Sequence, residues 1–143
     1  MIFDIIKARQ MFEPEIVAVA AMNRTEEQLH GLNENVKALK RCPLHDIETE
    51  VEIDNKFHLL ISGATHNAVV TLLMGPVFEV IPKFKKAIFA KSKMANIKGE
   101  KNILIQFHED IYNAICNKDS REAYYSMREH IKRSERNYRN SLQ

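Results

Sequence analysis

Residues 46–62 read DIETEVEIDNKFHLLIS, and this stretch predicts the fold more clearly than any other. Apolar residues such as Ile47 and Val51 recur at intervals of three or four positions, which is the spacing of one face of an α-helix. Asp54 and His58 fall on the same face, one turn apart. The segment therefore predicts an amphipathic helix whose inward face carries two polar side chains.

The rest of the chain repeats this helical pattern between short breaks. Thr25-x-x-Gln28 forms a capping box, and Asp119 starts a similar signal before the last helix. Gly75-Pro76 predicts a break between two further helices. We expect an all-α fold, an antiparallel bundle of about six to seven helices that forms a single domain over residues 1–143. The predicted segments cover about 2–22, 25–40, 46–62, 67–75, 76–91, 102–117 and 119–140.

Composition and charge exclude several classes of protein. The 143 residues include 21 Lys and Arg against 19 Asp and Glu, and this net charge of +2 gives no reason to infer nucleic-acid binding. Cys42 and Cys116 form no C-x-x-C pair, which argues against a disulfide framework or a thiolate metal site and favours a cytoplasmic setting. No apolar run approaches the length of a membrane span, and the N-terminus lacks the pattern of a secretory leader.

Two further helices carry histidines on their apolar stripes. His108 follows Leu104 and precedes Ile111, and His130 follows Met127 at the same kind of spacing. Each histidine taken alone is better explained as a core residue with a structural hydrogen bond. Three imidazoles and one carboxylate together would suit zinc, nickel, iron or manganese and would leave coordination positions open. The spacing alone leaves both interpretations open.

Five short motifs resemble a known family. The run 54–58, DNKFH, resembles the D-x-x-F-H motif of the FCD domain, the effector-binding domain in the FadR subgroup of GntR-type transcription regulators. Residues 107–115 and 123–131 are similar to its H-x-x-I-x-x-A-I and A-x-x-x-M-x-x-H-I segments. Residues 9–13 match its R-x-x-x-E opening, and residues 65–67 match its turn that ends in Asn. The motifs occur in the family's order and extend through about the whole chain.

The resemblance implies a metal-dependent binding domain. In that family's pattern, Asp54, His58, His108 and His130 would bind a divalent ion, zinc or nickel first and manganese or iron as alternatives. A small organic acid would bind beside the ion, which would act as a Lewis-acid anchor for its carboxylate. No activated nucleophile or second carboxylate accompanies the four residues, so we expect no enzyme. The family also implies a homodimer.

One part of the family's usual architecture has no counterpart in this sequence. The family's regulators carry a winged helix-turn-helix domain before the effector domain, whereas here the effector-domain pattern begins at Ile2. We favour a chain that is the effector domain of a longer regulator, which would contact DNA only through that other domain. The alternative is a standalone metal-dependent small-molecule-binding protein or enzyme.

Two more residues are candidates for contact with the ligand. Arg9 lies on an apolar stripe, where its guanidinium could bind a carboxylate or could pair with Glu13 one turn later. Asn67 could donate to a ligand, although a helix N-cap is the favoured interpretation. The run from Lys83 to Lys101 contains seven lysines and one acid, and we expect a solvated face there.

Overall fold

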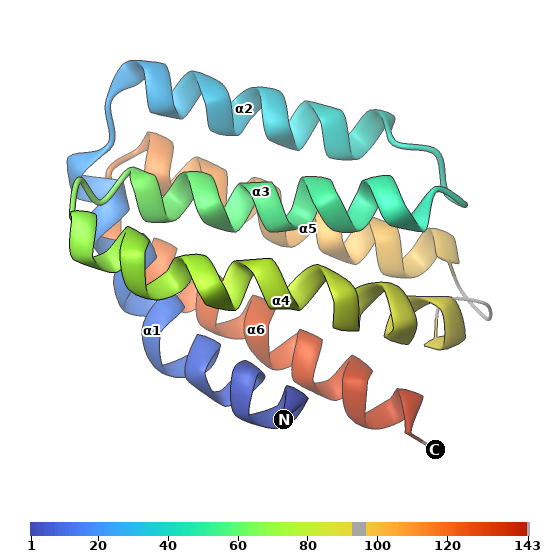
Figure 1. Ribbon diagram of the computed structural model, residues 1–143. Helices are drawn as coiled ribbons and strands as arrows, with labels where there is room; N and C mark the ends of the chain where they lie inside the picture. Colours follow the sequence, from blue (N-terminus) through green and yellow to red (C-terminus); the bar gives the residue numbers. More distant parts are fainter. Residues whose placement is uncertain (93–96, 143) are drawn as a thin grey trace.

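The computed structural model describes residues 1–92 and 97–142, with the side chains of residues 88–97 outside the description. Its described part contains no strand, so the predicted all-α fold is confirmed. Consecutive helices run antiparallel to one another (Figure 1). None of the described helices is both long and apolar enough to cross a membrane. The helices are α1 (Ile2–Asn23), α2 (Glu26–Arg41), α3 (Ile47–Gly63), α4 (Ala68–Ser92), α5 (Ile97–Cys116) and α6 (Ser120–Ser141).

Side-chain oxygens cap α2, α3 and α6 where the sequence predicts helix starts. The Thr25 hydroxyl accepts from the Gln28 amide at 3.1 Å, and the Gln28 side chain accepts from the Thr25 amide at 3.0 Å. Asp46 and Asp119 accept from backbone amides three residues later, at 3.1 and 3.0 Å. These contacts satisfy amides that no helical carbonyl can reach, and they confirm the predicted starts of α2, α3 and α6.

The main core lies between α1, α2, α3, α5 and α6. Helix α1 packs chiefly against α6, and α2 packs against α3 and α5. Helix α4 packs mainly on α3, and its own smaller cluster of Met74, Phe78 and Ile81 contacts Ile5 and Ile16 of α1. The fully buried side chains of the main core include Val17, Leu32, Phe57, Ile111, Ile115, Met127 and Ile131.

The predicted break at Gly75-Pro76 is wrong, because α4 continues through both residues and through Pro82 as well. A proline in a helix interior costs about 3 kcal/mol. Burial of a large apolar side chain contributes about 1.5–3 kcal/mol, and α4 buries three of them, including Phe78 and Ile81. The two prolines together cost about 6 kcal/mol and burial of the three side chains contributes about 4.5–9 kcal/mol, so burial can offset the local preference for a break. The described residues therefore form six helices.

The lysine-rich segment is also more helical than predicted. Helix α5 begins at Ile97 instead of near Asn102, while residues 93–96 of the predicted loop lie outside the described residues. Lys101 is 4% exposed, and its ammonium donates to the Cys42 carbonyl oxygen. The expectation of one solvated lysine face is therefore wrong for Lys101, and also for Lys85, which points inward.

Candidate metal centre

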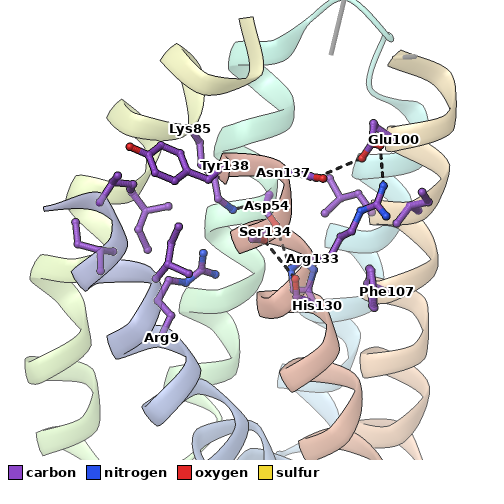
Figure 2. Close-up of a pocket in the computed structure, with 16 residues that line it drawn as sticks. Arg9, Asp54, Lys85, Glu100, Phe107, His130, Arg133, Ser134, Asn137 and Tyr138 are labelled. Atoms are coloured by element: carbon purple, nitrogen blue, oxygen red, sulfur yellow. Dashed lines mark hydrogen bonds and ion pairs between the residues drawn. The ribbon is translucent and has the colours of Figure 1, made fainter. Parts of the chain in front are cut away.

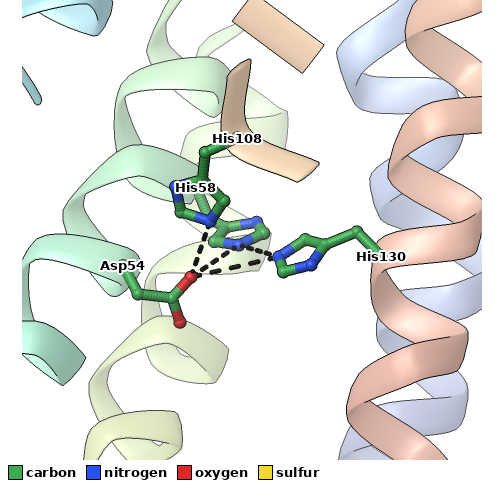
Figure 3. Close-up of side chains that lie close together, drawn as sticks. All are labelled: Asp54, His58, His108 and His130. Atoms are coloured by element: carbon green, nitrogen blue, oxygen red, sulfur yellow. Dashed lines mark hydrogen bonds and ion pairs between the residues drawn. The ribbon is translucent and has the colours of Figure 1, made fainter. Parts of the chain in front are cut away.

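Three helices bring Asp54, His58, His108 and His130 together inside the bundle (Figure 3). Asp54 and His58 lie one turn apart on α3, His108 lies on α5 and His130 on α6. None of the four residues is more than 2% exposed. Their positions follow from helical spacing, since each lies on the apolar face of its helix and these faces meet in the core.

The four side chains direct one ligand atom each toward a common point. The Nε2 atoms of His108, His58 and His130 lie 2.9, 3.5 and 3.9 Å from Asp54 Oδ1. The His58 and His130 Nε2 atoms are 3.2 Å apart. Ligand atoms around an ion with Zn–N bonds of about 2.0–2.1 Å would lie roughly 3 Å apart. The donor set and its spacing therefore fit a divalent ion.

Glu13 and Arg9 on α1 fix the orientation of the His58 ring. The Glu13 carboxylate can only accept, so the His58 Nδ1–H donates to it, at 2.5 Å, and this leaves the Nε2 lone pair facing the common point. Arg9 pairs with the other oxygen of Glu13. Burial would raise the pKa of Glu13, but Arg9 and His58 outweigh it and lower the pKa to about 2.

The surroundings favour the protonation states that a metal ion requires. Burial would raise the pKa of Asp54, but Lys85 and the neighbouring histidines outweigh it and hold the pKa well below its usual range. Burial lowers the pKa of His108. Burial, together with His108 and His58, lowers the pKa of His130 well below its usual value. At neutral pH Asp54 is thus ionised, while His108 and His130 are neutral and able to coordinate.

The structure places the two predicted ligand-contact residues, Arg9 and Asn67, in different surroundings. Arg9 is 2% exposed, pairs with Glu13 and also lines the cavity beside the four residues, so the two interpretations of Arg9 are compatible. Asn67 is exposed, and its Oδ1 accepts from the amides of Val69 and Val70 at 3.0 and 3.3 Å. This is the favoured N-cap role. Asn67 does not line the cavity, and its contact with a ligand stays a prediction.

A cavity lies beside the four residues, and Asp54 and His130 form part of its lining (Figure 2). Its volume is about 70 Å³, where a single water needs about 10–15 Å³. Several water molecules or a small organic ligand would therefore fit. The cavity is lined by Ile2, Ile5, Ile6, Arg9, Asp54, Ile81, Lys85, Glu100, Ile103, Leu104, Phe107, His130, Arg133, Ser134, Asn137 and Tyr138.

Sequence reasoning missed three charged residues that line this cavity, Lys85, Glu100 and Arg133. Lys85 donates to the second oxygen of Asp54 and is only 11% exposed in its side chain. Its position, four residues after the buried Ile81, would have indicated an inward side chain. Arg133 of α6 pairs with Glu100 of α5 at 2.8 Å. That pairing between helices had no sequence signal.

The comparison with protein families identifies the domain. The family model described as the FCD domain matches residues 4–133. The chain belongs to the FCD domain family. The resemblance found in the sequence motifs is therefore confirmed, over a range that includes the four candidate ligands.

Relatives of this FCD domain are named as transcription regulators. It is 27% identical over 128 residues to the uncharacterised HTH-type transcriptional regulator YcbG of Bacillus subtilis (strain 168), a match that covers 90% of this chain and 50% of that protein. It is 26% identical over 130 residues to the Uxu operon regulator of Haemophilus influenzae, covering 90% and 48%. The FCD domain thus spans about half the length of these curated relatives.

Solved structures share the fold of this FCD domain. Escherichia coli McbR/YncC matches with a TM-score of 0.81 at 15% identity, over 99% of this chain and 66% of that one. A Streptococcus agalactiae GntR protein matches with a TM-score of 0.74 at 20% identity, over 93% and 57%. At these identities the likeness establishes the helical arrangement.

Proposed function

We propose that this FCD domain is the effector-sensing part of a GntR-type transcription regulator and binds a divalent metal ion through Asp54, His58, His108 and His130. The observation that carries the proposal is the convergence of four buried ligand atoms, all within 4.8 Å of one another, at the wall of a cavity. Zinc or nickel is the expected ion, with manganese or iron as alternatives, because imidazole and carboxylate ligands suit all four. The bound ion would supply a Lewis-acid site for an anionic ligand.

The charges around the cavity favour a small organic acid as the effector. Three cations and three carboxylates balance one another, so a divalent ion would leave the site with an excess charge of about +2. Arg9 and Lys85 lie at the metal end of the cavity, where they would contact a carboxylate. The balanced groups are Arg9, Lys85, Arg133, Glu13, Asp54 and Glu100.

Ligand binding would act on the packing of the bundle. The cavity takes lining residues from α1, α3, α4, α5 and α6, so one small molecule would contact five helices at once. A ligand that binds one packing of these helices more tightly shifts the population toward it. In the intact regulator this shift would change how a separate DNA-binding domain is positioned, and the effector domain itself would play no catalytic part. The regulator would work in the cytoplasm, where bacterial DNA lies.

We also propose that two copies pair through α4. Its outward face carries an apolar stripe of Val69, Leu72 and Leu73, which are 60%, 74% and 67% exposed. Monomers rarely leave a contiguous apolar patch in water, and a second copy would cover it. Sedimentation should give a dimer for the wild type and a monomer for Leu72→Glu/Leu73→Glu. A monomeric wild type would contradict this pairing.

The metal site is tested by metal analysis of protein purified without a histidine tag. We expect about one equivalent of zinc or nickel after reconstitution, and its loss in His108→Ala and His130→Ala. His66→Ala is the matched control, because His66 is exposed and lies outside the cluster. Wild-type protein that binds neither added ion would overturn the proposed metal site.

The regulatory role is tested on the intact gene product. Gel-shift titration with candidate acids should change the affinity for its DNA when the metal site is occupied. Unchanged DNA affinity under saturating acid would rule out the sensing role and favour a standalone binding protein.

A further inference from the structure

The cavity beside the metal centre is lined by two chemically different sets of residues (Figure 2). The first set belongs to the metal centre or contacts it, is called the polar or metal end below, and consists of Arg9, Asp54, Lys85 and His130. Most of the remaining wall is aliphatic or aromatic and comes from α1, α4 and α5. These wall residues are Ile2, Ile5, Ile6, Ile81, Ile103, Leu104 and Phe107.

Of the five polar residues that line the cavity outside the metal end, all but Tyr138 take part in the side-chain hydrogen bonds described next. Arg133 donates to Glu100 at 2.8 Å, and Asn137 donates to the other oxygen of Glu100 at 3.3 Å. Ser134 donates to the His130 carbonyl oxygen at 3.3 Å. Among the described lining residues, the one buried donor without a partner outside the metal cluster is the Arg133 Nε. Besides this Nε, the Tyr138 hydroxyl is the further polar group that the described lining residues offer outside the metal end, so a ligand that carries several hydroxyls would find few hydrogen-bond partners there.

This distribution of polar and apolar residues determines how each chemical group of a ligand changes its affinity for the cavity. A carboxylate raises affinity at the polar end, where Arg9, Lys85 and the ion would attract it. A methylene group buried against the wall raises affinity by about fourfold. A hydroxyl buried there without a partner lowers affinity by about fivefold or more. A second carboxylate would meet Glu100, whose charge is already matched by Arg133.

We propose that the effector is a short monocarboxylate with an apolar body. Its carboxylate lies at the metal end between Arg9 and Lys85, and its hydrocarbon part lies against the isoleucine-rich wall. The cavity volume of about 70 Å³ restricts the body to a few carbon atoms or a small ring. This inference rests on the proposed metal and acid site and narrows its ligand class.

Calorimetric titration of the zinc-reconstituted chain tests the ligand class directly. The apolar series is acetate, butyrate and 4-methylpentanoate, and the polar probes are succinate and D-glucuronate. We expect affinity to rise about fourfold per added methylene group, so that 4-methylpentanoate binds at least fiftyfold more tightly than acetate. Succinate and D-glucuronate should bind more weakly than butyrate. A flat apolar series, or a polar probe that binds as tightly as 4-methylpentanoate, would overturn the inference.

Two variants on one helix distinguish the contribution of the apolar wall to affinity from that of the polar end. Ile103 lines the cavity, whereas Ile105 on the same helix is half-buried and does not. Ile103→Ser should weaken 4-methylpentanoate binding about tenfold and leave acetate unchanged, and Ile105→Ser should affect neither acid. If both variants behave alike, the wall does not select the ligand and the inference fails.

Failure of this inference is distinguishable from failure of the proposed function. Bound zinc with D-glucuronate preferred would overturn the apolar ligand class and leave the metal and acid site intact. Bound zinc with none of the five acids binding would overturn both the acid site and the inference. Absence of zinc binding would remove the metal site itself.

Discussion

Glu13 is the residue on which the orientation of His58 depends. It is 3% exposed and accepts from both His58 and Arg9. Because Arg9 and His58 outweigh the effect of burial and lower its pKa to about 2, Glu13 is ionised at all pH values at which the histidines can bind metal. A charged carboxylate behind a coordinating imidazole increases the basicity of the ligand nitrogen.

Replacing this carboxylate should weaken metal binding. For Glu13→Gln we expect zinc affinity to fall by about 10–100-fold, measured by competition with a chelator. Stability should also fall by about 3 kcal/mol, because Arg9 loses its buried partner. Glu15→Gln, at an exposed position of the same helix, should change neither quantity. Unchanged zinc affinity in a folded Glu13→Gln protein would argue against this role.

Lys85 should affect the ion and the acid in opposite directions. Its ammonium pairs with Asp54, so it repels a divalent ion and attracts a carboxylate. We expect Lys85→Met to raise zinc affinity and to lower butyrate affinity by about 10–100-fold, since a hydrogen bond to a charged group contributes about 1.5–3 kcal/mol. Exposed Lys83 supplies the control, Lys83→Met. A loss of both affinities would indicate that Lys85 instead supports the fold.

At the scale of elements, α4 shows how tertiary burial overrides local signals. Asn67 caps the first turn of this helix, and the buried side chains of Phe78 and Ile81 stabilise it further along. Pro76 and Pro82 interrupt the hydrogen-bond ladder between them without ending the helix. The result is a continuous helix that carries Lys85 to the cavity.

The cap also separates the two interpretations of Asn67. Asn67→Ala should destabilise the protein by about 1 kcal/mol, or roughly 3 °C in melting temperature, because two amides of the first turn lose their acceptor. Asn67→Ser keeps an acceptor and should restore most of this loss. Butyrate affinity should be unchanged in both variants. A parallel loss of butyrate affinity in both would show instead that Asn67 contacts the ligand.

At the scale of the whole molecule, the buried histidines make the metal-free protein sensitive to acid. Burial lowers the pKa of His108 and His130 below the ordinary value of 6.5. As pH falls, His108 and His130 therefore take up protons in the unfolded chain before they do so in the folded protein. Their contribution to the free energy of unfolding is complete above about pH 6.5 and is lost below it. The lowered carboxyl pKa values of Glu13 and Asp54 act only at lower pH.

Urea unfolding of metal-free protein between pH 8 and pH 5.5 measures this effect. We expect a plateau above about pH 7 and then a decline that approaches about 1.4 kcal/mol per pH unit for each of the two histidines. Zinc should displace the decline to lower pH, because the ion competes with protons for the same nitrogens. Equal stability at pH 8 and pH 5.5 without metal would contradict the assignment of two neutral buried histidines.

Part of the candidate site could be predicted from the sequence because it depends on local periodicity. Asp54, His58, His108 and His130 interrupt apolar stripes at helical spacing, and such stripes must face a core wherever the helices pack. The caps and the all-α class follow from equally local rules. The family motifs then indicated the same four residues as the ligand set that the resemblance implies.

Other features required the tertiary structure, because they depend on which helix faces which. Glu13 lies 45 positions from His58 in the sequence, and Lys85 lies 31 positions from Asp54. No rule of spacing connects residues so far apart, and their contacts exist only once α1 and α4 pack beside α3. The sequence by itself determined which side chains on the apolar stripes point inward, although it did not reveal the inward Lys85 and Lys101. The packing of the helices alone decided which of them meet, and therefore the orientation of His58, the counterion of Asp54 and the apolar wall of the cavity.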